Sequence, residues 1–267
     1  MPKIKEPAYF SPDIQGVGGI RNLDEYRALF RGAKPGAVIG EASAMYLFSE
    51  IAIEKIMISN PQAKIIVMLR RPENAARSLH QHSLGLLYED LNDFEDAWNA
   101  QPLRAMGLRL PANCPEPRVL QYGQVFRYSA QVRRVLSLVP EGQRHFIIFE
   151  EFFRYPFKHY AEVLKFLGLP DDSRTEFPVV NGAKKNRSRT LALLLNAASR
   201  ESPLLSFPRR LAHALGLHPL EALRNLNKKP TEKIEIRPAF AKELREYFAP
   251  DVAELEILLG RRLDAWH

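Results

Sequence analysis

One stretch predicts a strand followed by a helix at the centre of an α/β fold. It reads Lys64-Ile-Ile-Val-Met-Leu-Arg-Arg-Pro-Glu-Asn-Ala-Ala-Arg-Ser78. Its five consecutive apolar residues, Ile65 to Leu69, follow the turn residues Asn60-Pro61. A short apolar run between turn signals predicts a strand that is buried on both faces, as in a parallel sheet. Pro72 then stands where proline is tolerated, in the first turn of a helix.

This strand and helix place two polar residues at one end of the predicted sheet. Arg70 lies at the carboxyl end of the strand, and Ser78 lies in the second turn of the helix. Ligands of open α/β sheets bind outside the carboxyl ends of the strands. A guanidinium fork and a hydroxyl are suitable donors for a phosphate monoester. An ordinary strand–helix junction with solvated arginines has the same pattern, so the spacing alone leaves that alternative open.

The wider pattern resembles a known family. Arg70-x-Pro72-x-x-x-x-Arg77-Ser78 resembles the 3'-phosphate-binding motif of the sulfotransferases that depend on PAPS, 3'-phosphoadenosine 5'-phosphosulfate. Gly40 to Tyr46 is similar to the Glu-x-Ser/Thr-x-x-Tyr segment of the bacterial and heparan-sulfate-type branch, and Lys5 to Phe10 is similar to its Lys-Glu-Pro-His-Phe-Phe segment. Residues 237–260 resemble its closing helices. The similarity therefore covers nearly the whole chain in the same order.

The resemblance implies an α/β fold of the P-loop-NTPase-like type, with three layers and a central parallel sheet flanked by helices. It implies an enzyme that moves a sulfuryl group from PAPS to a hydroxyl or amine, releases 3',5'-ADP and needs no metal. The acceptor, which could be a glycan, a lipid or a small metabolite, is not identified by the sequence.

The resemblance also implies roles for particular residues. Arg70 and Ser78 would hold the 3'-phosphate, and Glu6 would act as the general base that deprotonates the acceptor. Lys184 and Lys185 would supply positive charge to the phosphosulfate. Tyr46 would face the acceptor.

Two departures from the family pattern stand out. The chain contains no Lys-x-Gly-Thr-Thr/Ser loop, which holds the 5'-phosphosulfate in the family by the mechanism of a P-loop. We therefore expect residues 1–267 to be a single sulfotransferase-like domain that starts after the first strand, loop and helix, and its activity in this form is in question. Ala42 also stands where the family often has a lysine, so a heparan-like acceptor does not follow.

The composition is that of a globular protein, with 46% apolar and 26% charged residues. The single cysteine, Cys114, excludes an internal disulfide. The sequence contains neither a run of 18 apolar residues nor the apolar region of a signal peptide. These features predict a soluble, cytoplasmic protein.

Positive charge is concentrated between residues 181 and 240, which contain twelve Lys or Arg and four Glu. Such a segment favours an anionic partner. Besides PAPS, this leaves an alternative of another class, a non-catalytic anion-binding module that uses the basic C-terminal third. Nucleic acid is not the expected partner, and a nucleotide kinase is disfavoured because the chain has no Walker loop.

Hydrophobic periodicity predicts the remaining elements. We expect strands over 37–39 and 145–149, helices over 46–59, 122–138 and 157–167, and two closing helices over 240–248 and 252–259. Gly168 is expected to end the third of these helices in a left-handed conformation.

Overall fold

The computed structural model describes residues 4–16, 19–178, 184–186, 188, 191, 226, 228–230 and 236–267. The chain forms two compact units, and each is described by itself. The first unit comprises Met1–Ala76, Pro115–Phe177 and Pro238–His267, and the second comprises Arg77–Cys114 and Pro178–Arg237.

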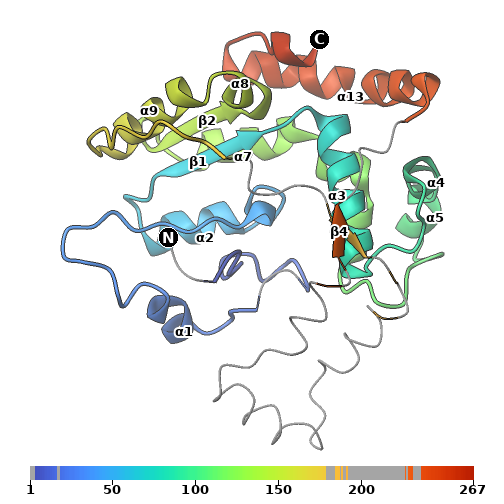
Figure 1. Cartoon of the computed structure of the whole chain (residues 1–267), viewed down its shortest axis with the longest axis horizontal. Helices are drawn as coiled ribbons and strands as arrows, with labels where there is room; N and C mark the ends of the chain where they lie inside the picture. The colour runs from blue at the N-terminus through green and yellow to red at the C-terminus, as the bar shows by residue number, and fades with distance from the viewer. Residues whose placement is uncertain are drawn as a thin grey trace, which may run out of the picture. The chain divides into compact units, whose positions relative to one another are not determined.

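A pair of parallel strands lies at the centre of the first unit (Figure 1). β1 (Ile65–Leu69) pairs with β2 (Arg144–Ile148) in a register that runs from Ile65 opposite Arg144 to Leu69 opposite Ile148. Both strands confirm the sequence prediction to within one residue. Because the carboxyl ends of the two strands lie side by side, the residues that follow them become neighbours.

The prediction that β1 is buried on both faces is wrong. Val67 and Leu69 are buried, whereas Ile66 and Met68 are 40% and 47% exposed. Successive side chains of a strand point to opposite faces, so this alternation means that the packed elements cover only one face of β1.

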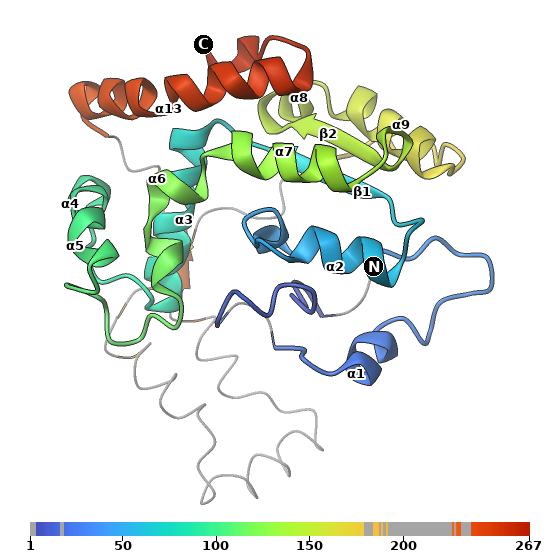
Figure 2. The ribbon, with the colours of Figure 1, turned by 180° about the vertical axis from the view of Figure 1, so that it is seen from behind.

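Several helices of the first unit pack beside the strand pair or against one another. α7 (Tyr128–Leu138) lies against both α2 (Ala52–Ser59) and α13 (Pro238–Leu259), as Figure 2 shows from behind. α8 (Phe149–Arg154) and α9 (Pro156–Leu167) follow β2 and contact it. The shorter elements of this unit are α1 (Leu23–Ala28), η1 (Ala44–Tyr46), η2 (Pro117–Leu120), α6 (Tyr122–Val125), η3 (Glu141–Gln143) and η5 (Asp264–Trp266).

The predicted helix over 46–59 is shorter in the structure, because α2 begins only at Ala52. The Ser49 hydroxyl oxygen accepts hydrogen bonds from the amides of Ile51 (3.3 Å) and Ala52 (3.0 Å). A serine that captures the first amides of a helix marks its start. Tyr46 therefore ends the separate turn η1 instead of opening a long helix.

The predicted helix over 122–138 is interrupted between α6 and α7. The buried carboxylate of Asp251, in α13, accepts hydrogen bonds from the amides of Tyr128 (2.7 Å) and Ser129 (3.2 Å) and from the Ser129 hydroxyl (2.5 Å). An aspartate from more than 120 residues away thus caps the N-terminus of α7.

The two closing helices form one element, α13, with Pro250 inside it. A proline removes one helical hydrogen bond but need not end a helix that is held by packing. Phe248, Val252 and Leu255 are buried on both sides of Pro250. In contrast, Gly168 ends α9 in the predicted left-handed conformation, with φ 75°.

The predicted strand over 37–39 does not form. Val38 and Ile39 are each 53% exposed, and this stretch pairs with no strand in the described part of the chain. Without a partner, a short apolar run has no hydrogen-bonding reason to become a strand.

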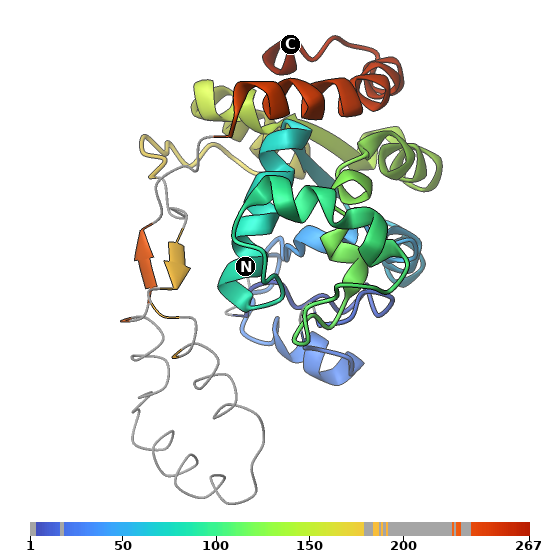
Figure 3. The same ribbon diagram turned by 90° about the vertical axis from the view of Figure 1, so that its right-hand side faces the viewer.

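The second unit contains most of α3 (Pro72–Leu86), which starts in the first unit, together with α4 (Phe94–Asn99) and α5 (Gln101–Ala105). Arg104 and Glu89 form a fully buried, bidentate ion pair. The two guanidinium nitrogens lie 2.6 and 2.7 Å from the two carboxylate oxygens. β3 (Lys184–Asn186) and β4 (Lys228–Pro230) form an antiparallel pair (Figure 3). Within the described ranges, no helix has the length and apolar character needed to cross a membrane.

Candidate functional site

Arg70 stands at the carboxyl end of β1, as the sequence predicts. Leu69 is in register with Ile148, so Arg70 lies beside Phe149, the residue that follows β2. Its guanidinium carbon lies 4.9 Å from the centre of the Phe149 ring. The ring holds the cation by a cation–π contact without neutralising its charge.

The Arg70 guanidinium is not satisfied by the protein. Its Nε is buried and has no hydrogen-bond partner, and no carboxylate in the described ranges forms an ion pair with it. Buried donors are nearly always hydrogen-bonded, so an unsatisfied one requires an explanation. An anionic ligand at this end of the sheet would supply the missing acceptor.

The backbone around Arg70 is fixed by contacts that the sequence did not indicate. The Glu150 carboxylate accepts hydrogen bonds from the Arg71 amide (3.0 Å) and from the Trp266 indole (2.9 Å). Tyr128, beneath the junction, hydrogen-bonds to the backbone of Arg70, and burial raises the pKa of its hydroxyl. The only signal in the sequence was the acidic pair Glu150-Glu151, which follows Phe149 just after β2.

Ser78 lies in the second turn of α3, which begins at Pro72 as predicted. Its side chain is exposed, and its hydroxyl makes no hydrogen bond within the described ranges. Arg70 belongs to the first unit and Ser78 to the second.

The two other family-like segments come together in the first unit. The Ala8 amide donates to the Ser43 hydroxyl oxygen (3.0 Å), and the Phe10 amide donates to the Tyr46 hydroxyl oxygen (3.3 Å). The carboxylate of Glu6 accepts one long hydrogen bond from the Ala44 amide (3.4 Å). Glu6 is exposed and forms no ion pair in the part of the chain that the structure describes. Its carboxylate therefore keeps oxygen lone pairs that no described residue occupies.

Glu41 organises this cluster and was not among the predicted site residues. Its carboxylate accepts hydrogen bonds from the hydroxyls of Tyr46 (2.6 Å) and Ser43 (3.0 Å). Burial, followed by the interaction with Glu41, raises the pKa of both Tyr46 and Tyr26. These phenols consequently remain protonated and act as hydrogen-bond donors at neutral pH.

The segment that carries Glu6 has an unusual backbone. Glu6 and Ala8 have positive φ angles of 52° and 49° on either side of Pro7. Residues other than glycine rarely adopt this conformation, and it tends to persist where surrounding contacts enforce it, often at functional sites. The next residues form an aromatic surface in which the rings of Tyr9 and Tyr26 stack at 4.6 Å.

Lys184 and Lys185 lie in β3, where they pair with Pro230 and Lys229 of β4. The sequence placed them in a loop, and the backbone shows a short strand instead. Most of the remaining basic segment lies outside the described residues. Within those that are described, no group of three or more His, Cys, Asp or Glu is arranged to hold a metal ion.

A family model described as a sulfotransferase domain matches residues 43–194, which is more than half of the chain. This chain belongs to the sulfotransferase family. Arg70, Ser78 and both lysines of β3 lie within the matched range, and Glu6 precedes it. The assignment confirms that the protein belongs to a family of enzymes and has an α/β fold of the P-loop-like class.

One solved structure agrees with this assignment. A sulfotransferase from Alicyclobacillus acidocaldarius is 28% identical with a TM-score of 0.68, over 99% of this chain and 87% of that one. A sulfotransferase domain from the curacin biosynthetic pathway is 16% identical with a TM-score of 0.36, over 73% of this chain and 68% of that one. The search of curated proteins gave no match.

Proposed function

We propose that this sulfotransferase uses PAPS as its sulfuryl donor and recognises the donor through the 3'-phosphate at Arg70. The observation that carries the proposal is the Arg70 guanidinium, whose Nε is buried and has no partner at the carboxyl end of β1. An arginine suits this role because its planar fork binds two phosphate oxygens at once. The hydroxyl of Ser78, which is exposed and makes no hydrogen bond to the described residues, supplies a further donor in the proposal.

In the proposed reaction, an oxygen or nitrogen of the acceptor attacks the sulfur of PAPS in line. A bond forms between the acceptor and sulfur, and the bond between sulfur and the 5'-phosphate oxygen breaks. 3',5'-ADP leaves with the electron pair of that bond. The protein contributes positioning and charge stabilisation, as in phosphoryl transfer.

Glu6 takes the proton of the attacking group in this proposal. Two observations support this role. The Glu6 carboxylate is exposed, and its one hydrogen bond within the described ranges is the long one from the Ala44 amide. A general base must reach its proton and keep a free lone pair. Tyr46, on the neighbouring segment, borders the acceptor.

Lys184 and Lys185 are proposed to offset the charge that develops on the leaving phosphate. The acceptor is a molecule with a hydroxyl or amine, such as a glycan, a lipid or a small metabolite. The reaction is proposed to take place in the cytoplasm.

Calorimetric titration of 3',5'-ADP, with 5'-AMP as the control ligand, tests the donor. We expect the nucleotide with the 3'-phosphate to bind at least about tenfold more tightly, as an added charge-assisted hydrogen bond provides. Arg70→Ala should weaken the binding of 3',5'-ADP. Arg31→Ala, which removes an exposed arginine elsewhere in the first unit, should leave this binding unchanged.

Equal affinity for the two nucleotides would refute recognition through the 3'-phosphate. Binding of both nucleotides that falls steeply with salt and ignores Arg70 would favour the non-catalytic anion-binding module instead.

A further inference from the structure

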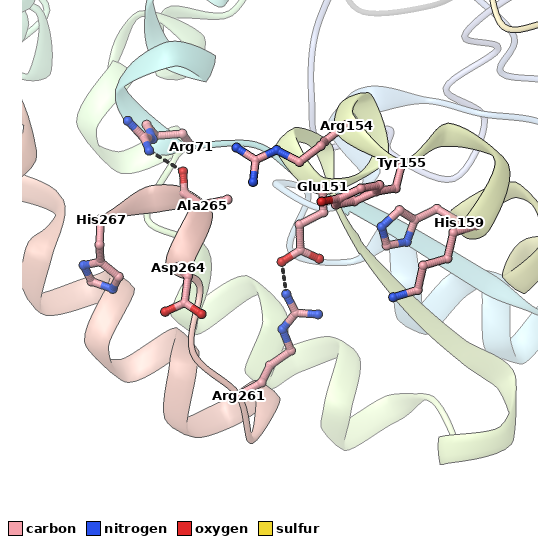
Figure 4. Close-up of a pocket in the computed structure, with 10 residues that line it drawn as sticks. Arg71, Glu151, Arg154, Tyr155, His159, Arg261, Asp264, Ala265 and His267 are labelled. Atoms are coloured by element: carbon pink, nitrogen blue, oxygen red, sulfur yellow. Dashed lines mark hydrogen bonds and ion pairs between the residues drawn. The ribbon is translucent and has the colours of Figure 1, made fainter.

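A polar pocket lies beside Arg71, the residue that follows Arg70. It has a volume of about 580 Å³ and is lined by residues of α8, α9 and the C-terminal segment, together with Arg71. Figure 4 shows these side chains arranged around the pocket. Arg70 does not line the pocket, although it is the neighbour of Arg71 in the sequence.

Positive charge dominates the lining. Four cationic side chains face the pocket, and they are Arg71, Arg154, Lys158 and Arg261. Two carboxylates accompany them, and each already has a cationic partner. Glu151 forms an ion pair with Arg261, and Asp264 lies 3.7 Å from Arg262.

Two of the four cations have no polar partner in the part of the chain that the structure describes. Neither Arg154 nor Lys158 forms an ion pair or a side-chain hydrogen bond within the described ranges. α9 begins at Pro156, between these two residues, and has 12 residues. The amides of its first turn therefore add the positive end of a helix dipole to the same place.

Arg71 and the two histidines of the lining have polar partners, although Arg71 Nε is buried without a hydrogen bond. Arg71 donates to the carbonyl oxygen of Ala265, a bond drawn as a dashed line in Figure 4. The imidazoles of His159 and His267 lie 3.0 and 2.9 Å from the carboxylates of Glu162 and Glu256. The charged side chains of the lining that lack a polar partner within the described ranges are consequently two exposed cations, Arg154 and Lys158.

We propose that this pocket binds a phosphate or sulfate ester whose organic part is about as large as a sugar or a mononucleotide. The anion contacts Arg154 and Lys158, and the exposed ring of Tyr155 between them gives the organic part an apolar surface. The volume suits such a ligand, since small-molecule sites measure about 300–1,000 Å³. A sulfotransferase would thereby carry a second anion site that is independent of Arg70.

The charge of the ligand predicts the order of the affinities. A phosphate monoester carries about −1.5 to −2 at neutral pH, whereas a sulfate ester keeps a single negative charge. We therefore expect glucose 6-phosphate to bind several-fold more tightly than glucose 6-sulfate, and glucose not to bind.

The test is a calorimetric titration of the full chain with these three ligands and with inorganic phosphate. The double variant Arg154→Gln/Lys158→Gln should weaken glucose 6-phosphate by at least about tenfold, because it removes two charge-assisted hydrogen bonds. Arg31→Gln/Lys165→Gln is the matched control, since it removes the same two charges from exposed positions outside the pocket. The control should keep the affinity of the wild type.

Arg70→Ala separates this site from the nucleotide site. The proposal predicts that this variant binds glucose 6-phosphate normally, even if it has lost 3',5'-ADP. The proposal is wrong if none of the esters binds, if the two double variants behave alike, or if Arg70→Ala abolishes binding of the sugar phosphate. If inorganic phosphate bound with the same affinity as glucose 6-phosphate, the organic part of the ligand would contribute nothing to binding, and that part of the proposal would be wrong.

Discussion

The Arg70 junction and the Glu6 segment are held in place by different means. Arg70 follows a strand whose backbone is paired with β2 along its whole length, and α8 and α9 contact β2 in turn. Glu6 lies in irregular backbone that side chains some 35 residues away hold through individual hydrogen bonds. In the proposed reaction the first region binds a fixed phosphate and the second meets the acceptor. The difference suggests that donor binding relies on the rigid scaffold, whereas acceptor binding relies on contacts that can vary without changing the fold.

Removing the cap of α7 should have the largest effect, because it breaks the support of the Arg70 junction. Asp251→Ala leaves two buried amides and a hydroxyl without their acceptor. We expect the free energy of unfolding to fall by about 3 kcal/mol or more. Urea denaturation measures it. Asp264→Ala removes the same charge from an exposed position and should cost less than about 0.5 kcal/mol.

Removing one hydroxyl from the Glu6 segment should have a smaller effect on stability. Tyr46→Phe deletes the donor to Glu41 and the acceptor of the Phe10 amide. We expect a loss of about 1–2 kcal/mol, which is the cost of one or two hydrogen bonds. If the two regions are independent, this variant should still bind 3',5'-ADP like the wild type. A large loss of nucleotide affinity would show that they are coupled.

Relieving the backbone strain at Ala8 should have the smallest effect on stability. Whether the protein becomes more or less stable tests whether the strain exists. Ala8 adopts a φ of 49°, which glycine reaches without strain. Ala8→Gly should therefore stabilise the protein slightly or leave it unchanged, within about 1 kcal/mol. Ala42→Gly, at an exposed position where φ is not positive, should lower the melting temperature. If Ala8→Gly and Ala42→Gly lowered the melting temperature equally, the backbone at Ala8 would not be strained.

The sequence predicted the Arg70 junction because its signals are local. The apolar run Ile65 to Leu69 and the proline two residues after Arg70 are sufficient to define a strand followed by a helix. The acidic partner of that junction was not predictable, since Glu150 and Trp266 meet Arg71 only through tertiary packing. The same holds for Asp251, which interrupts a helical pattern from more than 120 residues away.

The Glu6 segment was predicted only by family resemblance. No periodicity marks it, and the hydrogen bonds that join it to the Glu41 segment cross about 35 residues of sequence. The resemblance pointed to both segments but did not identify Glu41, whose carboxylate accepts hydrogen bonds from the hydroxyls of Ser43 and Tyr46. Ser78 and the two lysines of β3 stay predictions that binding experiments must test.

The most direct test of Arg70 is the ratio of the affinities for 3',5'-ADP and 5'-AMP, measured in the wild type and in Arg70→Ala. If Arg70 binds the 3'-phosphate, the wild type discriminates between the two nucleotides by at least about tenfold, and the variant has a ratio close to one. If Arg70→Ala lowered the affinities for both nucleotides equally, so that their ratio stayed that of the wild type, Arg70 would not be the residue that binds the 3'-phosphate.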